Sequence, residues 1–242
     1  SSDVCSSDLV GYRLGLNNAG DSKLDSDTSD GKSTQNYYSS ERGIAKLQKY
    51  AEEFGLGDTS GMEIPESDPQ ISDDNSVLSA IGQGTNNYTV SQINRYVTAV
   101  ANRGTVYSLS LIDKTTDSNG KLIKDYTPEV VNQMDEISSS TWDLVHNGME
   151  SMVKSSSTFA GMDISMGGKT GTAQYSKIHA DNVLFVGYAP ADSPEISIAV
   201  RIANGYASTY AAEIGRDITK VYFNPESADE LRSEEHTSEL QS

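Results

Sequence analysis

The chain has 242 residues, of which 36% are hydrophobic and 22% are charged, and its formal net charge at pH 7 is −17. The length suits one domain or a little more, and the hydrophobic content lies well above that of a disordered chain. The strong negative charge disfavours nucleic acid and anionic membrane surfaces as partners. A single cysteine, Cys5, and three scattered histidines exclude a disulfide framework and disfavour a metal site, so no cofactor is predicted.

The two ends of the chain, residues 1–9 (SSDVCSSDL) and residues 232–242 (RSEEHTSELQS), differ in character from the part between them. Both resemble read-through from sequencing adapters, and the alternative is a pair of ordinary disordered termini. We therefore expect a non-native leader at residues 1–9, a domain over residues 10–225, and a disordered, partly non-native tail at residues 226–242. No apolar run approaches the ~20 residues of a membrane span, and no signal peptide is visible.

The segment after the leader begins with a polar stretch and continues as a helix. Residues 17–40 are rich in Asn, Ser, Asp and Gly, a composition typical of a long surface loop. Apolar side chains at helical spacing predict an amphipathic helix over residues 41–54, with Ser40 as its cap and Gly55 at its end. These apolar residues are Ile44, Leu47, Ala51 and Phe54.

A turn and a second helix follow. Gly82-Gln83-Gly84 predicts a tight, flexible turn. A nucleotide-binding role is disfavoured, because the full spacing of a phosphate-binding loop is absent. Thr89 and Gln92 have the spacing of a capping box, and the helix that they begin is expected to close at Gly104. Its core-facing residues are expected to be Val90, Ile93, Val97 and Val100.

A hairpin and a third helix are expected next. Asn119-Gly120 separates two β-like runs within residues 106–126, a combination that predicts a hairpin turn. Residues 142–153 predict a helix that packs on the core. The side chains expected along its buried side are Val145, Met149 and Met152.

The last third of the chain predicts a sheet covered by a helix. Residues 169–174, 183–188 and 196–202 read as strands, and the short links with proline suggest antiparallel neighbours. A final helix over residues 209–223 is expected to cover this sheet. The residues expected to face the sheet are Tyr210, Ile214, Ile218 and Val221. Grouped strands with helices beside them predict an α+β fold.

The most informative stretch is residues 167–174 (GGKTGTAQ), which combines a cation, two hydroxyls and three glycines. Lys169 supplies positive charge and hydrogen-bond donors. Thr170 and Thr172 are two apart, so on a strand their hydroxyls share one face, and Gly171 between them lets a ligand backbone approach closely. Such a stretch suits a small anionic group beside a reacting carbonyl. The alternative is a polar turn before a strand, because Lys-Thr-Gly is common by chance.

Residues 168–174 (GKTGTAQ) resemble the third signature of the penicillin-binding transpeptidases, the Lys-Thr-Gly element that accompanies Ser-x-x-Lys and Ser-x-Asn. Further stretches resemble the same family in the same order. They are residues 10–15 (VGYRLG), 50–57 (YAEEFGLG), 61–66 (GMEIPE), 80–84 (AIGQG), 97–104 (VTAVANRG) and 185–190 (FVGYAP). The resemblance is greatest to the class B enzymes of Gram-positive bacteria and runs from about Val10 to Phe223.

The resemblance implies an antiparallel sheet with flanking helices, as the C-terminal part of an incomplete penicillin-binding transpeptidase (serine β-lactamase-like) fold. The family's two N-terminal strands and its nucleophile helix would be missing, which would leave apolar surface and a sheet edge uncovered. No Ser-x-Asn occurs in the chain. Matches to Ser-x-x-Lys begin at Ser29, Ser118 and Ser151, but none has the context of a nucleophile. The nucleophilic serine is therefore expected outside this chain, and the chain alone is expected to be inactive.

The resemblance implies acyl transfer on peptidoglycan stem peptides that end in D-Ala-D-Ala, with β-lactams as substrate analogues. It assigns catalytic roles to Lys169, Thr170, Gly171 and Thr172, and substrate binding to Lys169, Thr170, Thr172 and Gln174. It also implies cell-wall synthesis proteins as partners, a location outside the cytoplasm, and an N-terminal membrane anchor in the parent protein. Two alternatives stay open, a serine β-lactamase or D,D-carboxypeptidase and a noncatalytic penicillin-binding-like sensor module.

Overall fold

The computed structural model describes most of the chain. The described residues are Leu14, 39–174, 178–229 and Leu231. The predicted leader, all but the last two residues of the predicted loop at 17–40 and most of the predicted tail lie outside them, as does the stretch at residues 10–15 except for Leu14. No helix within the described ranges is both long and apolar enough to cross a bilayer.

The chain divides into two compact units. The first consists of Ser1–Gln92 and Ser108–Gln133, and the second of Ile93–Tyr107 and Met134–Ser242. The second unit therefore contains all the residues of the predicted sheet, including the Lys-Thr-Gly stretch.

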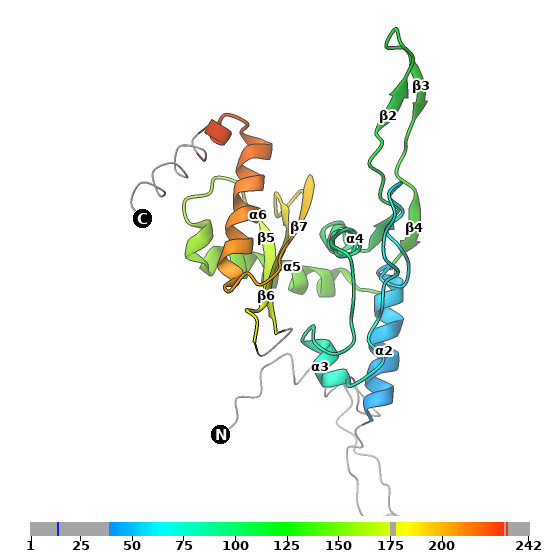
Figure 1. Ribbon diagram of the computed structural model, residues 1–242, viewed down its shortest axis with the longest axis vertical. Helices are drawn as coiled ribbons and strands as arrows, with labels where there is room; N and C mark the ends of the chain where they lie inside the picture. The colour runs from blue at the N-terminus through cyan, green and yellow to red at the C-terminus, as the bar shows by residue number, and fades with distance from the viewer. Residues whose placement is uncertain (1–13, 15–38, 175–177, 230, 232–242) are drawn as a thin grey trace, which may run out of the picture. The chain divides into compact units, whose positions relative to one another are not determined.

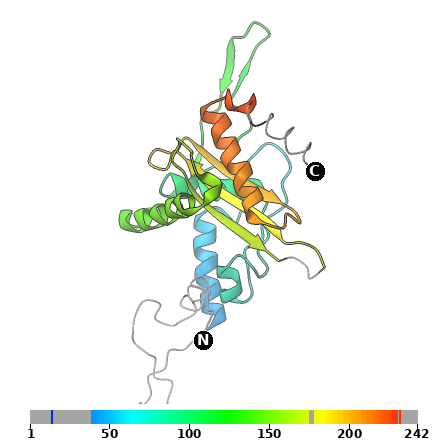
Figure 2. The same ribbon diagram turned by 90° about the vertical axis from the view of Figure 1, so that its left-hand side faces the viewer.

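A three-stranded antiparallel sheet forms the framework of the second unit (Figures 1 and 2). Its strands are β5 (Gly167–Ala173), β6 (Asn182–Ala189) and β7 (Ile196–Ile202), in the order β5-β6-β7. Strands that are consecutive in sequence are neighbours in space, as the short links predicted. With helices flanking this sheet, the predicted α+β fold class is confirmed.

Helix α6 (Ser208–Phe223) covers the sheet, but not with the predicted face. Three predicted contact residues are largely exposed: Tyr210 by 53%, Ile214 by 42% and Ile218 by 45%. The residues that the helix buries instead are Ala211, Ala212, Gly215 and Thr219. A Cβ at Gly215 would overlap the ring of Phe185, so only a face of small residues can approach this strand. The prediction was wrong because helical periodicity identifies the large apolar side chains as the buried ones. It contains no information about how much space the sheet leaves for them.

Helix α4 (Val90–Ala101) begins with the predicted capping box. The Thr89 N–H donates to Oε1 of Gln92 at 2.9 Å, and the Gln92 N–H donates to Oγ1 of Thr89 at 3.2 Å. Further along the helix, the hydroxyls of Thr98 and Ser197 lie 2.7 Å apart. Ser197 alternates with the core-facing isoleucines of β7, so α4 lies on the face of the sheet opposite α6.

Strand β1 (Thr105–Tyr107) comes after α4 in the chain. Helix α5 (Ser139–Ser155) comes later and precedes the short helix η1 (Ser157–Phe159). Its buried side is shifted from the predicted one, because Val145 is 40% exposed. The buried residues are Trp142, His146 and Val153. The large indole of Trp142 is buried, and the buried His146 satisfies its Nε2 on the carbonyl of Val100 at 2.8 Å, so the helix turns these residues inward.

In the first unit, α2 (Ser40–Glu53) matches the predicted helix with a one-residue shift at its start. The side chain of Ser39, not Ser40, caps the helix by accepting a hydrogen bond from the Arg42 N–H at 3.3 Å. The predicted end at Gly55 is confirmed, since this residue has a φ of 78° and its N–H bonds to the Glu52 carbonyl at 2.8 Å.

A short helix, α3 (Ser76–Ala80), precedes the Gly82-Gln83-Gly84 turn and was not predicted. Hydrogen bonds between hydroxyl groups stabilise this region. Ser72 Oγ and Ser79 Oγ lie only 2.6 Å apart in the interior. Both glycines of the turn have positive φ, as the tight-turn prediction requires. A Cβ on Gly84 would lie 3.0 Å from the Ser72 hydroxyl, so the serine pair and the glycine fit together closely.

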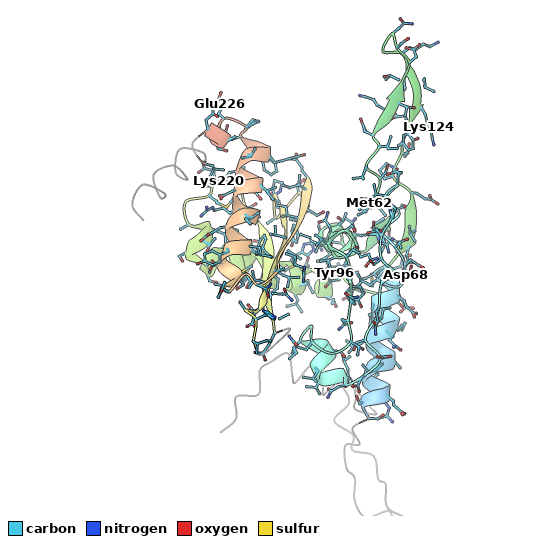
Figure 3. The ribbon with its side chains drawn as sticks, in the orientation of Figure 1. Met62, Asp68, Tyr96, Lys124, Lys220 and Glu226 are labelled. Carbon is cyan, nitrogen blue, oxygen red and sulfur yellow. The ribbon has the colours of Figure 1, made fainter. Side chains whose placement is uncertain are left out.

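The predicted hairpin is present as β2 (Lys114–Thr116) and β3 (Leu122–Asp125), and strand β4 (Val130–Gln133) follows it. Gly120 occupies the turn with a φ of 80°. Near the end of β3, the Lys124 ammonium lies 4.1 Å from the centre of the Tyr126 ring (Figure 3).

The carboxylate of Glu66 ties the connection after α2 to the start of α4. It accepts hydrogen bonds from the N–H and Oγ of Ser60, at 2.6 and 2.7 Å, and from the hydroxyls of Thr89 and Ser91. Burial raises the pKa of Glu66, but the hydrogen bonds from Ser91, Ser60 and Thr89 outweigh it and hold the pKa below its ordinary value near 4.5. The ionised carboxylate is therefore a stabilising element of the first unit.

We expect acid to destabilise the protein partly through Glu66. Because the folded-state pKa is lowered, the contribution is present above about pH 4.5 and is lost as the pH falls through the folded-state pKa. Glu66→Gln should lower the free energy of unfolding at pH 7 by ~1–3 kcal/mol and flatten its fall below pH 5, as measured by urea titration. Asp68→Asn is the matched control, since Asp68 is exposed on the same connection (Figure 3). Equal pH dependence in wild type and Glu66→Gln would contradict the assignment.

Candidate active site

Strand β5 carries the predicted site residues on an edge of the sheet. Among the described residues it pairs only with β6, so its other side is unpaired. Alternate residues of such a strand point their N–H and C=O groups to the unpaired side, where an extended ligand can bind them. Gly167 and Gly168 at the start are buried, whereas Lys169 and Thr172 are exposed. A buried segment thus leads directly into an accessible polar one.

The polar side chains of β5 point to both faces of the sheet. Thr170 lies opposite Phe185 of β6 and Thr172 lies opposite Val183, so the two threonines share one face, as predicted. Lys169 points to the other face. The lysine and the threonines can therefore meet one ligand only at the unpaired edge of the strand, where both faces are within reach.

The Lys169 side chain folds back onto its own strand, so its charge stays beside β5. Its Nζ donates a hydrogen bond to the backbone carbonyl of Thr170 at 2.6 Å. Within the described residues it makes no ion pair with a carboxylate, and the hydroxyls of Thr170 and Thr172 make no hydrogen bond. An exposed cation and two unengaged hydroxyls therefore lie within four consecutive residues, in a chain of strongly negative net charge. This arrangement suits a small anion.

Packing does not explain why position 171 is a glycine. A Cβ there would meet only the Cβ of Leu184, at 3.6 Å, which is ordinary van der Waals contact. Gly171 also has no positive φ. The sheet could hold a larger residue at this position, and the absent side chain leaves space beside the strand that a ligand backbone could approach. Gln174 follows the strand directly and is exposed, within reach of a ligand that runs along β5.

The three Ser-x-x-Lys matches do not form a nucleophile in the described residues. Ser29 lies outside them, and Ser118 belongs to the β2–β3 turn. Ser151 is exposed on α5 and donates its hydroxyl to the Asn147 carbonyl at 2.7 Å, while Lys154 pairs with Glu150 at 2.6 Å. The serine and lysine of this match thus engage other partners and not each other.

Two aromatic residues of β6 pack against the strand that carries the candidate site, and neither was singled out from the sequence. Phe185 and Tyr188 are both fully buried, and their rings lie against the glycines that precede Lys169. Burial raises the pKa of Tyr188 to about 12, the negative charge of Glu150 adds to the rise, and Arg103 opposes it. Tyr188 therefore stays protonated at neutral pH, and its effect on the strand comes from the packing of its ring. The tandem glycines were visible in the sequence, but their aromatic partners follow only from strand pairing.

The described residues contain no group of three or more His, Cys, Asp or Glu side chains that could hold a metal ion. The groups that β5 presents are hydroxyl, ammonium and backbone amide. These are groups for binding an anion or a carbonyl oxygen and for stabilising negative charge.

Fold and site together define an α+β domain that presents a polar strand at its edge. A sequence profile of the family described as "Penicillin binding protein transpeptidase domain" matches residues 23–220. The chain therefore belongs to the penicillin-binding protein transpeptidase family. This agrees with the resemblance seen in the sequence, and the class B, Gram-positive type is consistent with the relatives found.

Three curated relatives illustrate the match. Penicillin-binding protein 2B of Streptococcus pneumoniae is 29% identical over 208 residues, which covers 75% of this chain and 30% of the relative. Penicillin-binding protein 2A of Bacillus subtilis is 32% identical over 205 residues, with 73% and 28% covered. The peptidoglycan D,D-transpeptidase MrdA of Haemophilus influenzae is 25% identical over 220 residues, with 75% and 33% covered. The chain thus spans about a third or less of the length of these relatives.

Solved structures show the same fold. Penicillin-binding protein 2B from Streptococcus pneumoniae superposes with a TM-score of 0.67 at 27% identity, over 80% of this chain and 35% of that one. An imipenem acyl-enzyme complex of penicillin-binding protein A from M. tuberculosis superposes with a TM-score of 0.66 over 92% of this chain and 60% of that one. At 16% identity, this second similarity concerns the fold alone.

The contacts of Ser151 lead to a prediction about reactivity. Ser151→Ala should change the free energy of unfolding by no more than ~0.5 kcal/mol, because the residue is exposed. Neither the Ser151→Ala chain nor the wild-type chain should gain the mass of penicillin on exposure to it, as measured by intact mass. A wild-type chain that gains the mass of penicillin, together with a Ser151→Ala chain that does not, would make Ser151 a nucleophile and overturn this reading.

Proposed function

We propose that this chain is the Lys-Thr-Gly part of a D,D-transpeptidase that crosslinks peptidoglycan stem peptides by serine acyl transfer. The observation that carries the proposal is the exposed edge strand of a penicillin-binding transpeptidase domain, on which Lys169, Thr170, Gly171 and Thr172 follow one another. The peptidoglycan D,D-transpeptidase named among the relatives supports the reaction type. The imipenem acyl-enzyme reported for penicillin-binding protein A supports acylation chemistry on this fold.

The proposed reaction has two steps. A serine hydroxyl attacks the carbonyl carbon of the penultimate D-alanine, the new C–O bond replaces the peptide C–N bond, and the terminal D-alanine leaves with the proton of the serine. An amine of a neighbouring stem peptide then attacks the ester, forms the crosslinking amide and returns a proton to the serine. Covalent catalysis of this kind replaces one difficult step by two easier ones. We propose that the serine belongs to a part of the protein outside this chain, so that the chain alone is inactive.

Each residue of β5 receives a role that its position permits. Lys169 would supply positive potential for the terminal carboxylate, or for the carboxylate of a β-lactam, and Thr170 and Thr172 would donate hydrogen bonds to it. The backbone N–H of Thr172 would contribute to the oxyanion hole. Gly171 would allow the substrate backbone to lie close to the strand, and Gln174 would contact the substrate beyond the strand end. The exposure of Lys169, Thr172 and Gln174 supports these roles.

The proposal extends to location and partners. Peptidoglycan lies outside the cytoplasm, so the complete protein would work there, held to the membrane by an N-terminal helix in a part of the protein outside this chain. Other proteins of cell-wall synthesis would be its partners. The noncatalytic sensor module and a β-lactamase activity are outcomes that the following tests would reveal, and wall crosslinking by the complete protein would separate a transpeptidase from a D,D-carboxypeptidase.

The first test compares two proteins by intact mass after exposure to benzylpenicillin: this chain, and a version extended upstream to its natural start. We expect only the extended protein to gain the mass of one penicillin, because it alone would contain the serine. Labelling of the short chain would overturn the placement of the nucleophile. A folded extended protein that stays unlabelled would favour the sensor module. A rapidly hydrolysed adduct would favour a β-lactamase.

The second test concerns Lys169 in the extended protein. Lys169→Ala should slow acylation by benzylpenicillin by ~10²-fold or more, the effect of losing one electrostatic contact to the transition state. Lys124→Ala, which removes the same charge from the exposed hairpin, is the control and should acylate at the wild-type rate. Wild-type acylation by Lys169→Ala would remove Lys169 from the site.

A further inference from the structure

The two glycines before Lys169 lie between two buried aromatic rings. A Cβ on Gly168 would come within 2.8 Å of the Phe185 ring, and a Cβ on Gly167 would come within 2.5 Å of Cζ of Tyr188. Real Cβ contacts are never this short, so no residue larger than glycine fits at either position unless the neighbours move. Successive residues of a strand point to opposite faces, so the two rings grip the strand from both sides.

We propose that Phe185, assisted by Tyr188, is a positioning residue for the Lys169–Thr172 segment: its ring fixes the register and depth of β5, and thereby the place of the Lys169 ammonium at the sheet edge. The catalytic consequence of this inference rests on the proposed function. The positioning of β5 does not, because it follows from the packing alone.

The surroundings of Phe185 leave its ring no freedom. The ring is fully buried, and glycines from three elements make room for it: Gly168 of β5, Gly187 of β6 and Gly215 of α6. The ring of Phe159 lies 5.5 Å away between centroids and closes another side. A rigid ring enclosed by backbone cannot adapt by changing rotamer as a flexible side chain would, so its position dictates how close the three backbones come.

This packing also excludes a shifted register of β5. A shift by one residue would turn Lys169 toward the core face, which its charge opposes. A shift by two residues keeps the faces, but it would bring Met166 or Thr170 to the place of Gly168. Both carry a Cβ, for which the Phe185 ring leaves no space. Of the registers that keep the faces of the strand, the observed one therefore places a glycine under the ring and the two-residue shifts do not.

Tyr188 reinforces the same segment from the other face. Its ring covers Gly167, which is its partner across the strand pair, and it lies 5.3 Å from the imidazole of His146 on α5. The imidazole is itself held by its hydrogen bond to the Val100 carbonyl. The start of β5 is thus braced by helices on both sides of the sheet, while the end that carries Thr172 is exposed.

A pair of variants separates positioning from mere stability. Gly168→Ala and Gly215→Ala each add one methyl group against the same ring, the first from β5 and the second from α6. Helix α6 exposes Ile214 and Ile218 on its outer side, so it can yield outward, whereas β5 is held between two rings. Both variants should lower Tm. Only Gly168→Ala should speed amide hydrogen exchange across residues 167–173, by tenfold or more, in this 242-residue chain.

The same variants in the extended protein test the catalytic consequence. Gly168→Ala should slow acylation by benzylpenicillin by ~10–100-fold, since displacement of a catalytic group by about 1 Å costs this much. Gly215→Ala should stay within about threefold of wild type. Gly168→Ala combined with Phe185→Leu should recover part of both the exchange protection and the acylation rate, because the smaller side chain leaves room for the methyl group.

Equal exchange in β5 for Gly168→Ala and Gly215→Ala, or a double variant no better than Gly168→Ala alone, would overturn the proposal. If either alanine variant fails to fold, Phe185→Leu alone decides the matter. It should speed exchange in β5 more than in β7, and uniform loss of protection would mean that the ring serves stability only. An extended wild-type protein that penicillin does not acylate would refute the proposed function, while the exchange measurements would still judge the positioning.

Discussion

The close approach of three backbones around the ring of Phe185 is the constraint on which the second unit depends. Glycines on β5, β6 and α6 surround this ring. A Cβ on Gly168 or Gly215 would collide with the ring, and a Cβ on Gly187 would come within 3.0 Å of it. The ring therefore sets the distance between sheet and helix, the face that α6 turns inward, and the register of β5. Removal of a buried aromatic ring typically costs ~3–5 kcal/mol, a large share of the stability of a domain. A single residue of β6 thus links the core to the strand that carries the site.

The first unit is held by different interactions. Its connections depend on hydroxyl and carboxylate groups, with Glu66 gathering donors from Ser60, Thr89 and Ser91, and with buried serines such as Ser72 and Ser79 bonded to each other. Hydrogen bonds to a charged group are stronger than those between neutral groups, but they depend on ionisation. We therefore expect the first unit to lose stability in acid and the core around Phe185 to respond to changes in side-chain volume.

The candidate site lies on the edge strand of the sheet, as far as the described residues show. An unpaired strand edge is normally a liability, because it invites pairing with other chains. Here the edge strand begins buried between two rings and carries an exposed lysine and threonine. Rigid support at one end and exposure at the other are what the proposed role of β5 requires, because electrostatic catalysis depends on donors that need little reorganisation.

Local patterns in the sequence were sufficient for the features that depend on neighbouring residues. The capping box of Thr89 and Gln92, the end of α2 at Gly55, the hairpin at Gly120, the strands and the Lys-Thr-Gly stretch all follow from chemistry within a few positions. The faces of α5 and α6 did not, because burial there is decided by the partner surface: Gly215 faces inward only because Phe185 needs the space. From the sequence alone, the two glycines before Lys169 could equally be explained as flexible residues. Only the pairing of β5 with β6 shows that Phe185 and Tyr188 pack against them. Sequence by itself determined which groups the strand carries, and tertiary structure decided where they are held, since volume and register are properties of residues distant in the chain.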